Sequence, residues 1–168
     1  MKLTNPTDPN HPLYAEAVQK TSFAWLVYYV VCLVTAPVVG KLAERFSMKA
    51  VHAGGLLCMA GGLLSMFVLT EPDQAVIAMG VAGIGWATTL SIPFAWAAQY
   101  SPEGKGGVHL SVFNTYIALA SFFASPIVGF VVTYTGNDAA AMVLAGSAVL
   151  VSIALLALVK EQTATTRA

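Results

Sequence analysis

The sequence predicts an all-α fold, a polytopic membrane bundle of five transmembrane helices. Three observations support this prediction. The chain contains five apolar runs of about 19 to 25 residues, the linkers between them are too short for soluble domains, and only 10% of the residues are charged. A helix rises about 1.5 Å per residue, so about 20 apolar residues cross the roughly 30 Å hydrocarbon core of a bilayer. We therefore expect the lipid bilayer to surround most of this chain.

The five expected spans follow one another with few polar residues inside them. No Asp, Glu, Lys or Arg lies in the middle of any span. Intramembrane charges usually mark proton or ion relays, so we expect no coupling residue within this chain. The expected bounds are Ser22–Gly40, Val51–Leu69, Ala75–Ala98, Val108–Val132 and Ala139–Val159.

Basic residues lie on alternate linkers, which predicts the orientation. Lys41, Arg45 and Lys49 follow the first span, Lys105 follows the third, and the linkers after the second and fourth spans carry no base. Positive residues stay cytoplasmic, so we expect an outside N-terminus and a cytoplasmic C-terminus in a plasma or inner membrane. The predicted parts are an extracytoplasmic arm (1–21), a transmembrane domain (22–160) and a cytoplasmic tail (161–168).

Paired glycines in the second span predict close helix packing. Gly54 and Gly55 precede Gly61 and Gly62 by seven residues, which places both pairs on one helix face. Small faces let backbones approach where lipid offers no hydrophobic drive for association. The third span is expected to pack in the same way through Gly80, Gly83 and Gly85.

Aromatic and polar residues gather in the third and fourth spans. Pro93 removes one backbone hydrogen bond and is expected to kink the third helix, and kinked helices at membrane depth border cavities. Asn114 lies about one and a half turns inside the fourth span, where an unbonded amide is costly. Sugars are bound by aromatic faces together with amide and hydroxyl groups. The predicted substrate-binding residues are Trp86, Thr89, Asn114 and Tyr116.

The same residues have a second interpretation, in which they make hydrogen bonds between helices or anchor the bundle at the membrane surface. Trp96, Tyr100 and Tyr134 lie near span ends and are expected to be interfacial anchors. His109 lies beside a linker, so we expect it to be a solvated histidine rather than a proton relay.

Two segments resemble a known transporter family. Gly40-Lys-Leu-Ala-Glu-Arg-Phe46 resembles the G-x-L-A-[DE]-R signature of major facilitator superfamily transporters. The block from Gly83 to Ala95, followed by Gly107-Val-His-Leu-Ser-Val-Phe-Asn114, is similar to the tenth and eleventh helices of the glycoside–pentoside–hexuronide and sucrose–proton symporters, a group that includes bacterial maltose and α-glucoside permeases.

The resemblance implies that the chain corresponds to helices 8 to 12 of a twelve-helix transporter. The full-length protein would then take up a disaccharide together with H⁺ by alternating access, and the missing N-terminal helices would carry the acidic coupling residue. This chain departs from the family pattern at Ser111, where members often have Gly, and at Ile117–Ala124, where they often have a Pro-Gln pair. A different solute is therefore an open alternative.

The resemblance also suggests a gating loop after the first span. Gly40 is expected to allow a tight turn, Glu44 to cap the next helix or pair locally, and Arg45 to bond helix-end carbonyls. The alternative is that Lys41 and Arg45 only fix the topology.

Other functions are either excluded or remain as alternatives. Eight Lys and Arg scattered between helices make no basic stripe for nucleic acid. No nucleophile stands beside a base and no cluster has metal-ligand spacing, so we expect no enzyme, cofactor or metal. A superfamily carrier of another solute, a non-transporting membrane scaffold and a truncated remnant remain the alternatives to sugar symport.

Overall fold

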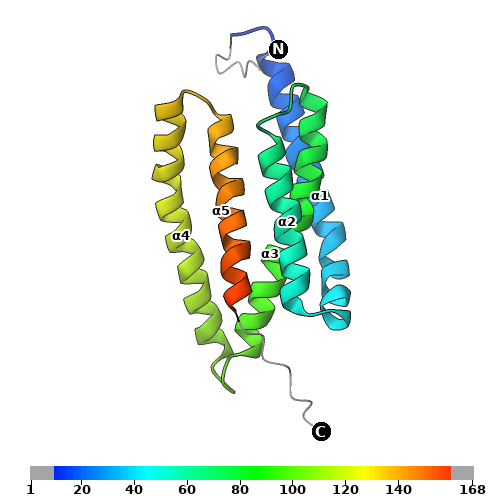
Figure 1. The fold of residues 1–168 in the computed structure, drawn as a ribbon, viewed down its shortest axis with the longest axis vertical. Coiled ribbons are helices and arrows are strands. Elements are labelled where there is room, and N and C mark those ends of the chain that lie inside the picture. Colours follow the sequence, from blue (N-terminus) through cyan, green and yellow to red (C-terminus); the bar gives the residue numbers. More distant parts are fainter. Residues whose placement is uncertain (1–9, 160–168) are drawn as a thin grey trace.

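A computed structural model describes residues 10–159, and within them the chain forms five α-helices (Figure 1). Each of these helices is long and apolar enough to cross a membrane. The predicted all-α bundle of five spanning helices is therefore confirmed for this part of the chain. The helices are α1 (Tyr14–Arg45), α2 (Met48–Ser65), α3 (Pro72–Gln99), α4 (Gly106–Thr135) and α5 (Ala139–Leu158).

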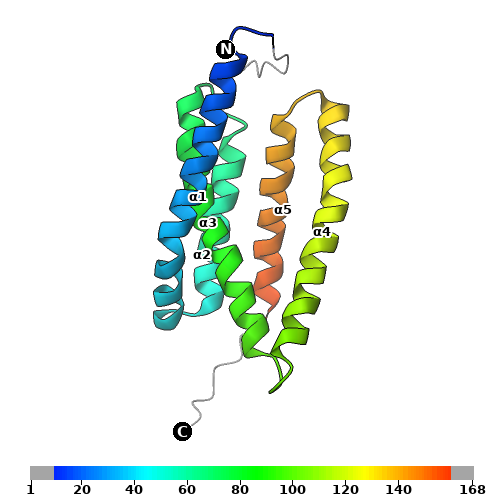
Figure 2. The same ribbon diagram turned by 180° about the vertical axis from the view of Figure 1, so that it is seen from behind.

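The helices form two groups that lie side by side. Helices α1, α2 and α3 pack together, and α4 and α5 form a hairpin beside them, with α5 next to α2 (Figures 1 and 2). Helix α3 lies against α1 and α2 and reaches α4 near its C-terminal end, where the rings of Phe94 and Phe113 meet edge to face at 5.0 Å. Helix α1 begins at one end of the bundle and α5 ends at the other, as an odd number of spans requires.

Glycines bring the backbone of α3 close to both of its neighbours. A Cβ added at Gly83 would lie 2.5 Å from the carbonyl oxygen of Tyr28 in α1. Gly85 faces the opposite neighbour, where a Cβ would collide with the backbone of α2 near Met59. The predicted packing role of the glycines in this helix is therefore confirmed at these two positions.

Only one glycine of each pair in α2 faces α3. A Cβ at Gly55 would collide with Thr88, and one at Gly62 would lie 2.5 Å from the carbonyl oxygen of Ala78. Gly54 and Gly61 have open space around them. Adjacent residues in a helix point about 100° apart, so a pair shares a helix side but only one member meets the partner backbone.

Helix α1 is longer at both ends than the sequence predicts. It begins at Tyr14, inside the predicted arm, and continues through Gly40 to Arg45. The predicted tight turn at Gly40 is therefore wrong, because α1 continues to Arg45 and the turn into α2 begins only at Phe46. Charged residues at a helix end are solvated without breaking the helix. Between Pro37 and Phe46 there is no further proline that would stop α1 earlier.

Side chains stabilise several helix ends. The hydroxyl of Ser47 accepts a hydrogen bond from the backbone N–H of Ala50 (3.1 Å), so Ser47 caps α2 in the place predicted for Glu44. Gly136 ends α4 with a φ of 61°, a conformation that glycine adopts at low cost. Lys49 donates from Nζ to the carbonyl oxygens of Ala157 (2.9 Å) and Val159 (2.6 Å), which ties the start of α2 to the end of α5.

Helix α4 is the most exposed element. None of its residues is buried, although its apolar composition suits a membrane span. Its large side chains Phe122, Phe123 and Phe130 are exposed. Much of its surface therefore remains available to lipid or to further helices.

We predict that Gly62→Ala destabilises the bundle while Gly61→Ala does not. The added methyl group at position 62 would press on the backbone of α3, and such overpacking costs about 1 to 3 kcal/mol. At position 61 the methyl group meets open space. Thermal unfolding of both variants in lipid nanodiscs, followed by circular dichroism, measures the difference. Equal melting temperatures would show that the α2–α3 contact is not tight.

Candidate functional site

Trp86 lies at the contact between α3 and α1. Its ring is half-buried, with its centroid 6.4 Å from that of Tyr28. It packs against a core of Cys32, Val39, Ala87 and Ile92. The surroundings of this predicted binding residue are therefore aromatic and apolar.

Thr89 is half-buried one turn further along α3. Its hydroxyl donates to the carbonyl oxygen of Gly85 at 3.1 Å, and the neighbouring Thr88 donates to the same oxygen at 2.8 Å. Helix α3 runs through Pro93 to Gln99 without a break. Because proline has no N–H, Pro93 leaves the carbonyl oxygen of Thr89 without its usual helical partner.

Asn114 and Tyr116 lie on α4 and are exposed, with Tyr116 67% accessible. Within the described part of the chain, neither side chain has a hydrogen-bond partner. The nearby hydroxyls bond inside their own helix, as in Ser111 to Gly107 (2.8 Å) and Thr115 to Ser111 (2.9 Å). Among the polar side chains in this part of α4, the amide of Asn114 therefore stays available for a hydrogen bond to another molecule or helix.

The structure does not gather the four predicted binding residues around one pocket. The contact of Phe94 with Phe113 fixes the relative height of α3 and α4. At about 1.5 Å per residue, Trp86 and Asn114 then lie about 10 Å apart along the bundle axis. Trp86 also faces α1, whereas Asn114 belongs to the exposed surface of α4.

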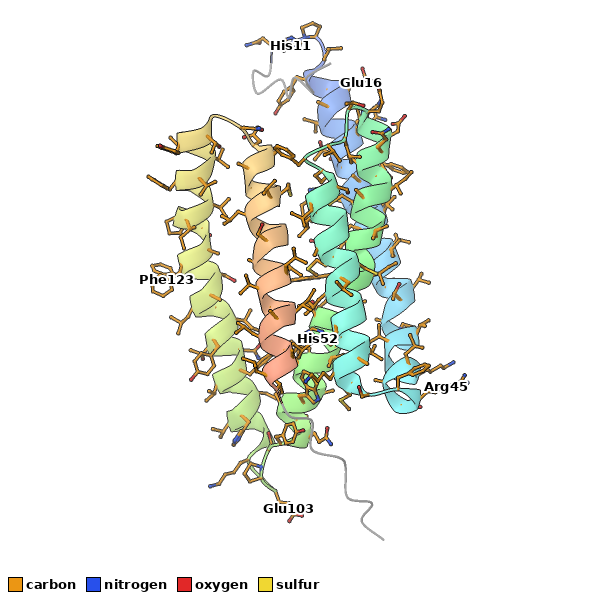
Figure 3. All side chains as sticks on the ribbon, in the orientation of Figure 1. His11, Glu16, Arg45, His52, Glu103 and Phe123 are labelled. Carbon is orange, nitrogen blue, oxygen red and sulfur yellow. The ribbon has the colours of Figure 1, made fainter. Side chains whose placement is uncertain are left out.

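The predicted gating residues lie in the last turns of α1, at the end of the bundle that also carries Glu103 (Figure 3). The guanidinium of Arg45 lies 5.9 Å from the ring centroid of Phe46. Gly40 and Glu44 are helical rather than part of a loop. If these residues act in gating, they therefore do so as part of the last turns of α1 rather than as a loop.

The structure shows two features of α1 and α2 that the sequence analysis did not predict. The first is a group of aromatic side chains on α1, formed by Trp25, Tyr28 and Tyr29, with ring centroids between 5.1 and 5.9 Å apart. The spacing of these residues at i, i+3 and i+4 inside an apolar run is the signal that identifies them.

The second feature is a buried histidine on α2. His52 is only 8% exposed, its Nδ1 has no hydrogen-bond partner in the described structure, and its ring meets that of Trp96 edge to face at 6.0 Å. Figure 3 shows it among the helices rather than at the surface. A histidine near the start of an apolar helix is the sequence signal, since ionisable residues at membrane depth are uncommon.

Two shallow hollows lie at the other end of the bundle. One of about 340 Å³ lies between α2 and α3, beside Gly61, Ser65 and Gln74. The other, of about 530 Å³, surrounds Lys20, whose Nζ lies 3.6 Å from Glu16 and 3.5 Å from Asp73. Neither hollow is lined by a predicted binding residue. Over residues 10–159 no three His, Cys, Asp or Glu side chains are grouped to hold a metal ion.

The sequence matches the Major Facilitator Superfamily over residues 9–168. It is also similar to "Multidrug resistance protein 3" of Bacillus subtilis (strain 168), with 26% identity over 113 residues. That alignment covers 66% of this chain and 22% of the relative, so the chain spans about a fifth of the relative's length. No solved structure matches the chain.

We predict that His52→Phe leaves the bundle at least as stable as the unmodified chain. Phenylalanine keeps the ring contact with Trp96 and removes a buried nitrogen that has no partner among the described residues, and leaving such a group buried costs about 1 to 3 kcal/mol. Urea or thermal unfolding in nanodiscs measures the change, with His109→Phe at the exposed start of α4 as the control. A marked loss of stability in His52→Phe alone would show that the imidazole makes an essential polar contact.

Proposed function

The chain belongs to the Major Facilitator Superfamily, and from this premise we propose that it is the C-terminal membrane part of a secondary active transporter for a small organic solute. It is a multi-pass membrane protein, since its five helices suit spanning and its family consists of transporters. The observation that supports a solute pathway is the exposed amide of Asn114, which lies inside an apolar span and has no hydrogen-bond partner among residues 10–159. An amide in contact with lipid is costly, so we assign it to a polar pathway or a further helix.

We further propose a plasma or inner membrane location with the end of α5 in the cytoplasm. Lys41, Arg45, Lys49 and Lys105 all lie at the end of the bundle where α5 finishes. The opposite end carries Lys20 with several carboxylates. This bias agrees with the retention of positive residues on the cytoplasmic side.

Alternating access requires helices beyond these five. The exposed surface of α4 is a suitable contact for them, because none of its residues is buried within the described bundle. We propose that the N-terminal helices of the same transporter cover part of this surface, and that Glu44 and Arg45 support a gate at the cytoplasmic end of α1.

Two classes of solute have specific support. The likeness of Gly83–Ala95 and the start of α4 to sugar–proton symporters favours a disaccharide carried with H⁺, with Trp86, Thr89, Asn114 and Tyr116 as its contacts. The name of the Bacillus relative favours a drug-like solute. The geometry supports the second class better, because Trp86 has aromatic and apolar neighbours and lies far from Asn114.

We predict that transport needs both this chain and the missing helices. The chain would be expressed alone and beside the seven N-terminal helices of a related transporter, in cells without their own permeases and efflux pumps. Labelled maltose, labelled sucrose and ethidium would be followed with and without a protonophore. Protonophore-sensitive movement of one of these solutes only in the paired cells is the expected result.

Two substitutions test the residues involved. In paired cells, Trp86→Ala or Asn114→Ala is expected to reduce transport at least tenfold while membrane insertion is unchanged. Phe123→Ala is the matched control, since this ring is exposed on α4 and points away from the bundle (Figure 3). Normal transport by both variants would contradict their assignment. If no solute moves although the protein is in the membrane, a scaffold or a remnant becomes the better explanation.

A further inference from the structure

Four aromatic side chains form a continuous group across α1 and α3. The rings of Trp25 and Tyr29 are stacked, with centroids 5.9 Å apart and planes inclined by 26°. Tyr28 lies edge to face with both, at 5.4 Å from Trp25 and 5.1 Å from Tyr29, and also contacts Trp86 of α3. We call these four residues the aromatic cluster.

Three residues of the aromatic cluster, Tyr28, Tyr29 and Trp86, lie at the middle of their helices, and Trp25 lies about one turn nearer the start of α1. The midpoint of α1 falls between Tyr29 and Val30, and the midpoint of α3 falls between Gly85 and Trp86. Aromatic residues that anchor a protein in the membrane lie at the two membrane–water interfaces. The position of the cluster is therefore that of a site at membrane depth rather than that of an interfacial anchor.

The cluster presents both ring surface and hydroxyl groups. Trp25 is 44% and Tyr29 57% exposed, while Tyr28 and Trp86 are half-buried. In the described part of the chain, the hydroxyls of Tyr28 and Tyr29 have no hydrogen-bond partner. Tyrosine hydroxyls usually have a hydrogen-bond partner when they are removed from water. These two hydroxyls are therefore suited to form hydrogen bonds with polar atoms at the edge of a bound molecule.

A second stacked pair provides a comparison within the same chain. Phe130 and Tyr134 of α4 are also four residues apart, with centroids 6.0 Å apart and planes inclined by 15°. They lie in the last two turns of α4, at the depth of an interfacial anchor. The two pairs have similar ring geometry and differ in depth.

The chemistry of the aromatic cluster selects a class of ligand. Aromatic faces stack on other flat rings and attract delocalised positive charge. In residues 10–159 every Asp and Glu lies near an end of a helix or in a connection, so a compact charge would find no carboxylate beside the cluster. Sugars need many hydrogen bonds, whereas the core around Trp86 consists of Cys32, Val39, Ala87 and Ile92.

We propose that the aromatic cluster binds a planar aromatic solute, with the solute ring against Trp25 and Tyr29 and its polar edge near the tyrosine hydroxyls. This inference rests on the proposed transport function and names the solute class that the transporter carries. Trp86 and Tyr28 hold the cluster in place through the contact between α1 and α3.

Ethidium, a planar aromatic cation, is the probe. The full chain would be placed in phosphatidylcholine nanodiscs and titrated with ethidium, with fluorescence polarisation as the readout and protein-free nanodiscs subtracted. Saturable binding is expected, weakened at least fivefold by Tyr29→Ala or Trp25→Ala and less by Tyr29→Phe, which keeps the ring. Phe130→Ala is the matched control and is expected to bind as the unmodified chain does. Circular dichroism of each variant checks that the helices are retained.

Several outcomes would overturn the proposal. These are the absence of saturable binding to the unmodified chain, equal weakening by Tyr29→Ala and Phe130→Ala, and displacement of ethidium by millimolar maltose. The test is independent of the uptake assay. Solute uptake without ethidium binding would support the transport function and refute the aromatic site. Ethidium binding without uptake of any solute would support the aromatic site and refute the transport function.

Discussion

The close approach of α3 to its two neighbours is the contact on which the rest of the bundle depends. In lipid, apolar side chains gain little by leaving the solvent, so helices associate through tight packing of small residues. Gly83 meets the backbone of α1, and Gly55, Gly62 and Gly85 bring α2 and α3 together. These contacts hold Trp86 beside Tyr28 and press Thr88 against α2. They also place α3 where its far end can meet α4 at Phe94.

We propose that the solute pathway uses surfaces that this packing leaves uncovered. Helix α4 contributes no buried residue, so the amide of Asn114 stays exposed inside an apolar span. On the other side of the bundle, Trp25 and Tyr29 are exposed at the middle of α1. Polar groups at membrane depth are stable only where water, a solute or another helix meets them. The chain belongs to a family of transporters, and we therefore assign these surfaces to the proposed solute pathway.

The sequence predicted the existence of all five spans, because runs of about 20 apolar residues have few alternatives in a membrane protein. It misplaced the ends of α1, since Tyr14–Lys20 and Lys41–Arg45 are polar but contain nothing that stops a helix. It predicted close packing at Gly54, Gly55, Gly61 and Gly62 but not which of them face α3, because that depends on the rotation of α2. The aromatic cluster was not predicted, since Tyr28 and Trp86 are far apart in the sequence and meet only through the contact of α1 with α3.

The most direct test of a solute pathway at membrane depth is the reactivity of single cysteines toward a membrane-impermeant maleimide. Cys32 and Cys58 would first be replaced by alanine, and a cysteine then introduced at Tyr29 or, as the control, at Phe123. Thiols react as thiolates and therefore need water around them. We expect the cysteine at position 29 to be labelled, and ethidium to slow its labelling, whereas the cysteine at position 123, which faces away from the bundle, is not labelled. Equal labelling at the two positions, or none at position 29, would contradict this expectation.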